Sequence, residues 1–161
     1  MRQPRPAGLL KIIMLYSKSS QYAIRSLVHL ASQPTGRLHR IEEIATQEEI
    51  PHYFLAKILQ RLARKRFVRS VKGVNGGFAL SKAPEELNLY VIVDAIDDLS
   101  VTLTDCVMGN TSCSDTKSCL LHEGWTKLKN QQIEFLQQIT IADLAATAAR
   151  KKEEQDDRRK I

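Results

Sequence analysis

The amino-acid sequence predicts a mainly helical fold with one small β-hairpin and a long C-terminal helix. Apolar side chains recur at helical spacing in residues 17–33, 40–48 and 50–67. Residues 68–81 change to the pattern of two short strands around a glycine-rich turn. Residues 119–139 then return to helical spacing.

The helices before the hairpin have recognisable starts and ends. Ser19 or Ser20 can cap the first helix, and the sequence QPTG (33–36) ends it. The third helix opens with Pro51, a residue that the first turn of a helix tolerates. Its apolar stripe consists of Leu55, Ile58, Leu59 and Leu62.

The hairpin is predicted from its glycines. Its tip contains four residues that can supply the positive φ angles of a tight turn, namely Gly73, Asn75, Gly76 and Gly77. Residues 83–98 start with Pro84 and are expected to continue as a strand stub and a short helix.

The C-terminal part begins with the long helix. Its apolar positions are Leu121, Trp125, Leu128, Ile133, Leu136 and Ile139. Residues 140–150 add a final turn or helix. The charged residues 151–161 are expected to be disordered.

At 161 residues, the chain is expected to form one domain with additions. Residues 14–98 make up the domain, and residues 99–145 form a loop and the long helix. Residues 1–13 show no period, so we expect a disordered extension there, with Met14 as a second candidate start. Residues 146–161 form a charged tail.

Positive charge is concentrated in the middle of the chain. The net charge is +6, yet no acidic residue occurs between Glu49 and Glu85. A basic block of this kind attracts phosphate groups by releasing condensed counterions. The alternative is an ordinary solvated helix face. The basic residues of the interval are Lys57, Arg61, Arg64, Lys65, Arg66, Arg69, Lys72 and Lys82.

A short helix, a tight turn, a basic helix and a basic hairpin follow one another in the order of a winged helix-turn-helix. In that design the second helix of the pair enters the major groove of double-stranded DNA, and the hairpin contacts the backbone or the minor groove. The residues expected to face bases are His52, Tyr53, Ala56, Lys57 and Gln60. Those expected to face phosphates are Arg61, Arg64 and Lys65, and the hairpin adds Arg69, Lys72 and Asn75.

All three cysteines lie in one polar loop between Cys106 and Cys119, and His122 follows three residues later. The spacing is Cys-x6-Cys-x5-Cys-x2-His, with Cys113 in the middle. The residues between them are mostly small and polar, so they can wrap around an ion but cannot form a core. Thiolates and imidazole suit zinc, cuprous copper and iron–sulfur clusters, and four ligands complete a zinc site or a 2Fe-2S cluster.

Spacing alone does not decide between these metals. Zinc sites favour C-x2-C pairs, which this loop lacks, whereas longer gaps can reach around a wider iron–sulfur cluster. One alternative is three unconnected buried cysteines. Another is a surface position for His122, with the fourth ligand coming from elsewhere.

Other classes of protein find little support in the sequence. No apolar stretch approaches the ~20 residues of a membrane-spanning helix, and residues 8–15 are too short for a signal-peptide core. An odd number of cysteines argues against a disulfide framework, so we expect a reducing, cytosolic location. No nucleotide-binding loop, small-molecule pocket motif or catalytic constellation indicates an enzyme or an electron carrier.

Several segments together resemble the IscR-type iron–sulfur regulators, within the BadM/Rrf-type class of winged-helix transcription factors. They are SKSSQYAIRSLVHLA (17–31), FLAKILQRLARKRFVRSVKGVNGGFAL (54–80), the three cysteines, CLLHEGW (119–125) and ITIADL (139–144). The resemblance implies a homodimer joined through the long helix, in which cluster state biases the DNA sites bound. It also implies a 2Fe-2S cluster held by Cys106, Cys113, Cys119 and His122.

Two positions bear on this resemblance. Nitric-oxide sensors of the class lack the histidine and take an acidic ligand from the first helix, where this chain has Gln21. IscR-type recognition helices tend to carry a carboxylate where this chain has Ala56, which leaves the operator sequence open. The alternatives are a nitric-oxide-sensing regulator of the same class and a zinc-stabilised DNA-binding protein with no sensing role.

Overall fold

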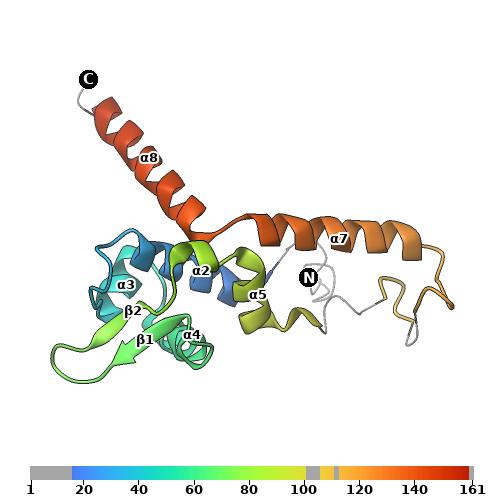
Figure 1. Ribbon diagram of the computed structural model, residues 1–161, viewed down its shortest axis with the longest axis horizontal. Coiled ribbons are helices and arrows are strands. Elements are labelled where there is room, and N and C mark those ends of the chain that lie inside the picture. The colour runs from blue at the N-terminus through green and yellow to red at the C-terminus, as the bar shows by residue number, and fades with distance from the viewer. Residues whose placement is uncertain (1–15, 101–105, 111–112, 160–161) are drawn as a thin grey trace, which may run out of the picture.

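The computed structural model describes residues 16–100, 106–110 and 113–159. Figure 1 shows a body of short elements from which two helices, α7 and α8, extend in different directions. The predicted fold class, a mainly helical winged helix-turn-helix with a hairpin and a long C-terminal helix, is confirmed. The extension predicted at residues 1–13, with Met14, lies outside the described residues.

The winged helix-turn-helix consists of three helices and a two-stranded sheet. Its helices are α2 (Lys18–Ala31), α3 (Ile41–Gln47) and α4 (His52–Arg64). Strands β1 (Val68–Val71) and β2 (Gly77–Leu80) pair antiparallel, with Val68 opposite Leu80. The loop before α3 joins the sheet, because His39 forms an isolated bridge with Phe78.

The core forms where the apolar faces of α2, α4 and α5 (Leu89–Asp97) meet. Ala23 and Leu27 of α2 are fully buried, and the stripe that the sequence predicted on α4 is buried as well. Burying each leucine or isoleucine side chain of this kind stabilises the fold by roughly 1.5–3 kcal/mol. The buried residues of α4 are Leu55, Ile58, Leu59 and Leu62.

Among the described residues, helix α7 (His122–Gln138) packs on the body through its C-terminal end. Leu136 is buried, and Ile139 packs against the core. The backbone N–H of Leu89 donates to the Ile139 carbonyl at 2.9 Å, and that of Ile141 donates to the Leu87 carbonyl at 2.8 Å. The predicted apolar stripe of α7 is therefore divided, because Leu121 and Leu128 remain exposed.

The hairpin tip differs from the prediction at two positions. Gly73 and Gly77 have positive φ angles, at 108° and 156°, but Asn75 and Gly76 do not. Gly76 serves a different purpose, since a Cβ there would lie 2.2 Å from the carbonyl oxygen of Val71. Its glycine permits a close approach of two backbone segments instead of a left-handed turn.

The segment before α5 also differs from the prediction. Residues Pro84–Glu86 form a short 3-10 helix, η1, and the expected strand stub is reduced to one bridge between Asn88 and Thr140. The side chain of Asn88 then accepts from the backbone N–H of Val91 and caps α5.

The charged tail is the largest correction. Residues 151–159, expected to be disordered, continue α8 (Ile141–Arg159). Alanine, glutamate, glutamine, lysine and arginine are strong helix formers, and Glu154 precedes Arg158 by four residues, a favourable order.

In the part of the chain that is described, no helix is long and apolar enough to cross a membrane.

Helix α2 is capped by Ser17, not by Ser19 or Ser20 as expected. The carboxylate of Asp97, at the end of α5, accepts hydrogen bonds from the backbone N–H and hydroxyl of Ser17. It also accepts from the hydroxyl of Ser20, a fully buried side chain, at 2.9 Å. Asp97 therefore fixes the end of α5 to the start of α2.

Replacing Asp97 with alanine should lower the free energy of unfolding by about 1–3 kcal/mol, because the buried Ser20 hydroxyl would lose its acceptor. Urea unfolding followed by circular dichroism measures this loss. Glu85→Ala, at an exposed position of η1, is the matched control and should change stability by less than about 0.5 kcal/mol. Equal losses in the two variants would contradict the role given to Asp97.

Candidate nucleic-acid interface and metal centre

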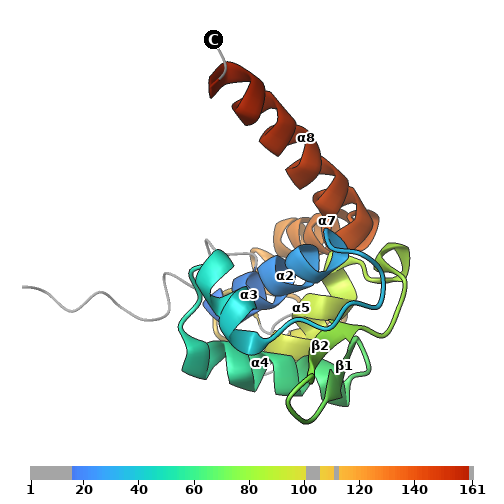
Figure 2. The same cartoon turned by 90° about the vertical axis from the view of Figure 1, so that its left-hand side faces the viewer.

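Helix α4 and the hairpin lie on one side of the body, and α8 leaves from the other side (Figures 1 and 2). The predicted base-facing residues on α4 are exposed, except for Ala56, which is half-buried. The exposed ones are His52, Tyr53, Lys57 and Gln60. The predicted phosphate-facing residues Arg61, Arg64 and Lys65 are exposed as well.

The start of α4 presents aromatic side chains to solvent. Tyr53 is 65% exposed, and its ring lies 4.2 Å from the Nζ atom of Lys57, one turn further on. Phe54 is also exposed and packs edge-on against Tyr53. Sequence reasoning missed Phe54, although its place outside the buried stripe of α4 was a usable signal.

The hairpin is held at both ends by arginines. Arg69 donates to the Gly36 carbonyl at 2.8 Å, and Arg40 donates to the Val74 carbonyl, also at 2.8 Å. Arg69 was predicted to contact DNA, whereas Arg40 was missed. Lys72 and Asn75 are exposed beside Val74 at the tip. The interface thus combines a fixed hairpin with an exposed basic helix.

The structure brings the three cysteines together. The Sγ atoms of Cys106, Cys113 and Cys119 all lie within 4.8 Å of one another, and all three residues are half-buried. The Sγ atoms of Cys106 and Cys119 are 3.7 Å apart. The described loop residues 108–110 and 114–118 are exposed, and the hydrophobic core includes none of the three cysteines.

His122 lies beside this group at the first position of α7. Its Nδ1 atom is 3.1 Å from the Sγ atom of Cys113. Its Nε2 atom is 3.0 Å from a carboxylate oxygen of Asp115. A carboxylate on the far nitrogen orients an imidazole for ligation through the near one. Sequence reasoning missed Asp115, which only the fold of the loop brings to His122.

The thiols differ in acidity. Burial raises the pKa of Cys106, but hydrogen bonds from the backbone N–H groups of Asn110 and Met108 outweigh it and bring the pKa to about 7. A backbone hydrogen bond from Cys119 lowers the pKa of Cys113, but burial and the neighbouring thiols raise it overall. Adjacent thiolates repel one another unless a cation compensates their charge. Three thiols and an adjacent imidazole therefore fit a soft metal ion or an iron–sulfur cluster.

The family model of the Rrf2 proteins, described as iron-dependent transcriptional regulators, matches residues 16–147. The chain belongs to the Rrf2 family. Its members are DNA-binding transcriptional regulators, so the chain is a regulator and not an enzyme.

Two relatives illustrate the match. An HTH-type transcriptional regulator of Aquifex aeolicus is 35% identical over 133 residues, which cover 81% of this chain and 91% of that protein. The HTH-type transcriptional regulator NsrR of Halalkalibacterium halodurans is 32% identical over 136 residues, covering 81% and 90%.

Solved structures agree in fold. The global cysteine regulator CymR of B. subtilis superposes with a TM-score of 0.67 at 18% identity, covering 81% of this chain and 95% of that one. T. potens IscR superposes with a TM-score of 0.62 at 22% identity, covering 86% and 90%.

Proposed function

We propose that the chain is a homodimeric transcriptional regulator whose DNA binding is modulated by a 2Fe-2S cluster, in the manner of the IscR-type regulators. The observation that carries this proposal is the convergence of three thiols in a polar loop, with the imidazole of His122 beside them at the start of α7. The proposed ligands are Cys106, Cys113, Cys119 and His122. The family description as iron-dependent regulators supports the same reading.

The DNA-reading surface is proposed to be α4 with the hairpin. His52, Tyr53, Lys57 and Gln60 lie on the exposed face of α4, where a recognition helix meets base edges. A cation–π contact with Tyr53 favours one orientation of the Lys57 side chain. Contacts to the DNA backbone are assigned to Arg61, Arg64, Lys65, Arg69, Lys72 and Asn75.

The dimer is proposed to form through α7. Leu121, Leu128 and Phe135 are 53%, 44% and 46% exposed and stand seven residues apart. This interval places side chains on one face of a helix and is the repeat of a coiled-coil contact. Leu136 lies on the face that packs against the body, so α7 can contact the body and a partner helix at once.

Coupling between the two sites is proposed to run along α7. When bound, an iron–sulfur cluster supplies a redox-sensitive link among its four ligands. His122 begins α7, and Ile139 and Ile141 bond the far end of that helix to Leu87 and Leu89 of the body. A change in the path of the cysteine loop would therefore alter how α7 pairs. The distance between the two recognition helices of the dimer would change as a result. That distance must match DNA half-sites about one turn of the double helix apart.

Two alternatives share much of this geometry. Three thiols and an imidazole also satisfy tetrahedral zinc, which would give a stabilised DNA-binding protein with no sensing role. The second alternative is a nitric-oxide-sensing regulator of the same class, against which the histidine after the third cysteine and Gln21 in the first helix both argue. Zinc is colourless and iron–sulfur clusters are not. The visible spectrum of anaerobically purified protein therefore distinguishes a zinc site from the proposed cluster.

Cys113→Ala should abolish iron binding and leave the fold intact, because Cys113 lies outside the hydrophobic core. Iron per chain, visible absorption and far-ultraviolet circular dichroism measure these properties. Ser118→Ala, an exposed position of the same loop, should keep its iron. His122→Ala should retain a cluster of shorter lifetime, since three thiolates remain. An unfolded Cys113→Ala, or one with full iron content, would show that the ligand assignment is wrong.

Arg61→Ala and Lys72→Ala should weaken binding to specific and random DNA alike. Each phosphate contact contributes roughly −0.9 to the slope of log affinity against log salt, so each variant should flatten that slope by about one unit per contact, or two for a dimer. Lys57→Ala should instead change sequence preference by roughly 1–3 kcal/mol at one base position in each half-site.

Fluorescence anisotropy on selected and scrambled duplexes across a salt series measures all three variants. Lys151→Ala on α8 removes the same charge on the opposite side of the body and serves as the control. Unchanged slopes for both Arg61→Ala and Lys72→Ala would mean that α4 and the hairpin are not the DNA face.

A further inference from the structure

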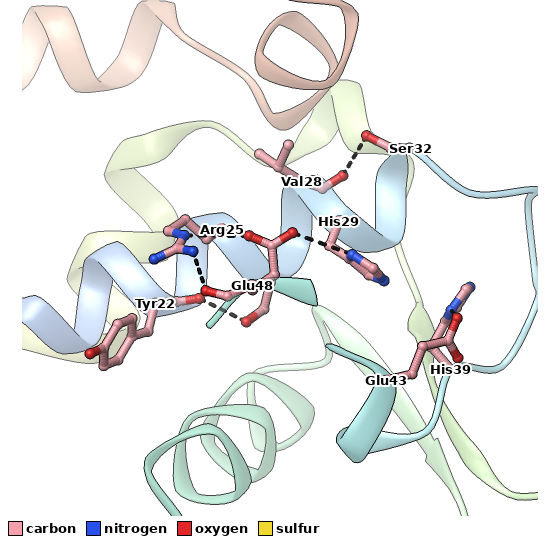
Figure 3. Close-up of polar contacts among 9 residues, drawn as sticks. Tyr22, Arg25, Val28, His29, Ser32, His39, Glu43 and Glu48 are labelled. Atoms are coloured by element: carbon pink, nitrogen blue, oxygen red, sulfur yellow. Dashed lines mark hydrogen bonds and ion pairs between the residues drawn. The ribbon is translucent and has the colours of Figure 1, made fainter. Parts of the chain in front are cut away.

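A second group of metal-ligating side chains lies inside the winged-helix domain. His29 comes from α2, His39 from the loop that pairs with β2, and Glu43 from α3. One ligand atom of each lies within 4.8 Å of the other two. His29 is 6% exposed and His39 is 1% exposed. Figure 3 shows the His29 ring directed from α2 toward the His39 ring.

Carboxylates hold one nitrogen of each imidazole. The Nδ1 atom of His29 is 3.3 Å from Glu48, and that of His39 is 3.1 Å from Glu43. The contact with Glu48 lies at Nδ1 of His29, so the Nε2 atom of His29 is left to bind an ion. The Nδ1 atom of His39 and a Glu43 oxygen lie side by side, at a separation that two ligands of one ion can have.

The Nε2 atoms of His29 and His39 are the unusual feature of this group. Both are buried, and neither has a hydrogen-bond partner within the described residues. The two rings stand perpendicular, with 5.5 Å between their centroids. A buried polar atom without a partner is destabilising, so such a group calls for an explanation. Two buried imidazoles with unpartnered nitrogens, grouped with a carboxylate, offer the donor types of a transition-metal site.

We propose that His29, His39 and Glu43 bind one divalent first-row metal ion, Zn²⁺ in particular. Two imidazoles and a carboxylate are suitable zinc ligands, and water can complete the tetrahedron. Glu43 is the open side of this site, since its side chain is 31% exposed beside the more exposed Arg37. Glu48 holds His29 from behind and is itself contacted by Arg25.

The position of the site gives it a structural consequence. His39 and Phe78 of β2 exchange both backbone hydrogen bonds, at 2.9 and 2.8 Å. A Cβ at Gly77 would lie 2.6 Å from the His39 carbonyl oxygen, so the His39 loop and β2 are in close backbone contact there. A metal ion on His39 would tie α2 and α3 to the base of the hairpin. The site is separate from the cysteines and does not depend on the proposed cluster.

The test uses the full chain with Cys106, Cys113 and Cys119 replaced by serine, so that thiols cannot bind zinc. Equilibrium dialysis against Zn²⁺ should find one ion per chain. Adding His39→Ala should weaken zinc binding by roughly 100-fold or more, and Glu43→Gln, which preserves side-chain size, by roughly 10–100-fold. His52→Ala, an exposed histidine outside the group, should leave zinc affinity unchanged.

Histidine-ring NMR signals provide a second measurement on the same protein. Zinc should shift the signals of His29 and His39 and leave those of His52 in place. Circular dichroism reports whether each variant is folded. If His39→Ala unfolds, the zinc affinity of Glu43→Gln tests the proposal. The proposal is wrong if the triple-serine chain binds no zinc, or if Glu43→Gln binds it as tightly as its parent.

Discussion

The apolar face of α2 is the packing surface on which the rest of the structure depends. Helices α4, α5 and α8 all pack against it, and β2 contacts it as well. Ala23 and Leu27 are fully buried at this junction. Because protein interiors are close-packed, a shift of one of these helices must be accommodated by the others. The recognition helix and the elements that lead to the cysteine loop therefore share one core.

The two functional regions occupy opposite ends of this arrangement. The exposed face of α4 and the hairpin form the proposed DNA side, and Cys113 lies beside His122 at the N-terminal end of α7. Figure 1 shows this end of α7 far from the hairpin. Asp97 joins α5 to α2, and the backbone bonds of Ile139 and Ile141 join the other end of α7 to the body. A helix anchored at one end and carrying ligands at the other is suited to convert a local change in the loop into a change of pairing geometry.

Local sequence patterns predicted those features that depend on neighbouring residues. The 3.6-residue period gave α4 its buried stripe, and the change of period at Val68 located the hairpin. The cysteine group was predictable because its members are close in sequence, so only a short loop has to close. Helix α8 was predicted to stop too early, because charge composition was weighed above helix propensity and the order of charges.

Features that depend on distant residues could not be predicted in the same way. Ser17 caps α2 together with Asp97, which lies eighty positions further along the chain. Asp115 meets His122 only after the loop has folded back. His29 and His39 read as unremarkable residues of a helix and a loop until the fold buries them side by side. In each case the signal lies in tertiary contact, which no local period encodes.

Occupancy of the cysteine site is proposed to change DNA affinity. The most direct measurement selects duplexes from a random pool with iron-loaded and with iron-free protein under anaerobic conditions. The affinity of both forms for each selected duplex is then compared at fixed salt. The DNA affinities of the two forms are expected to differ by roughly 5–150-fold on at least one duplex, the usual range of coupling between two sites. Identical selected sequences bound with equal affinity by both forms would contradict it.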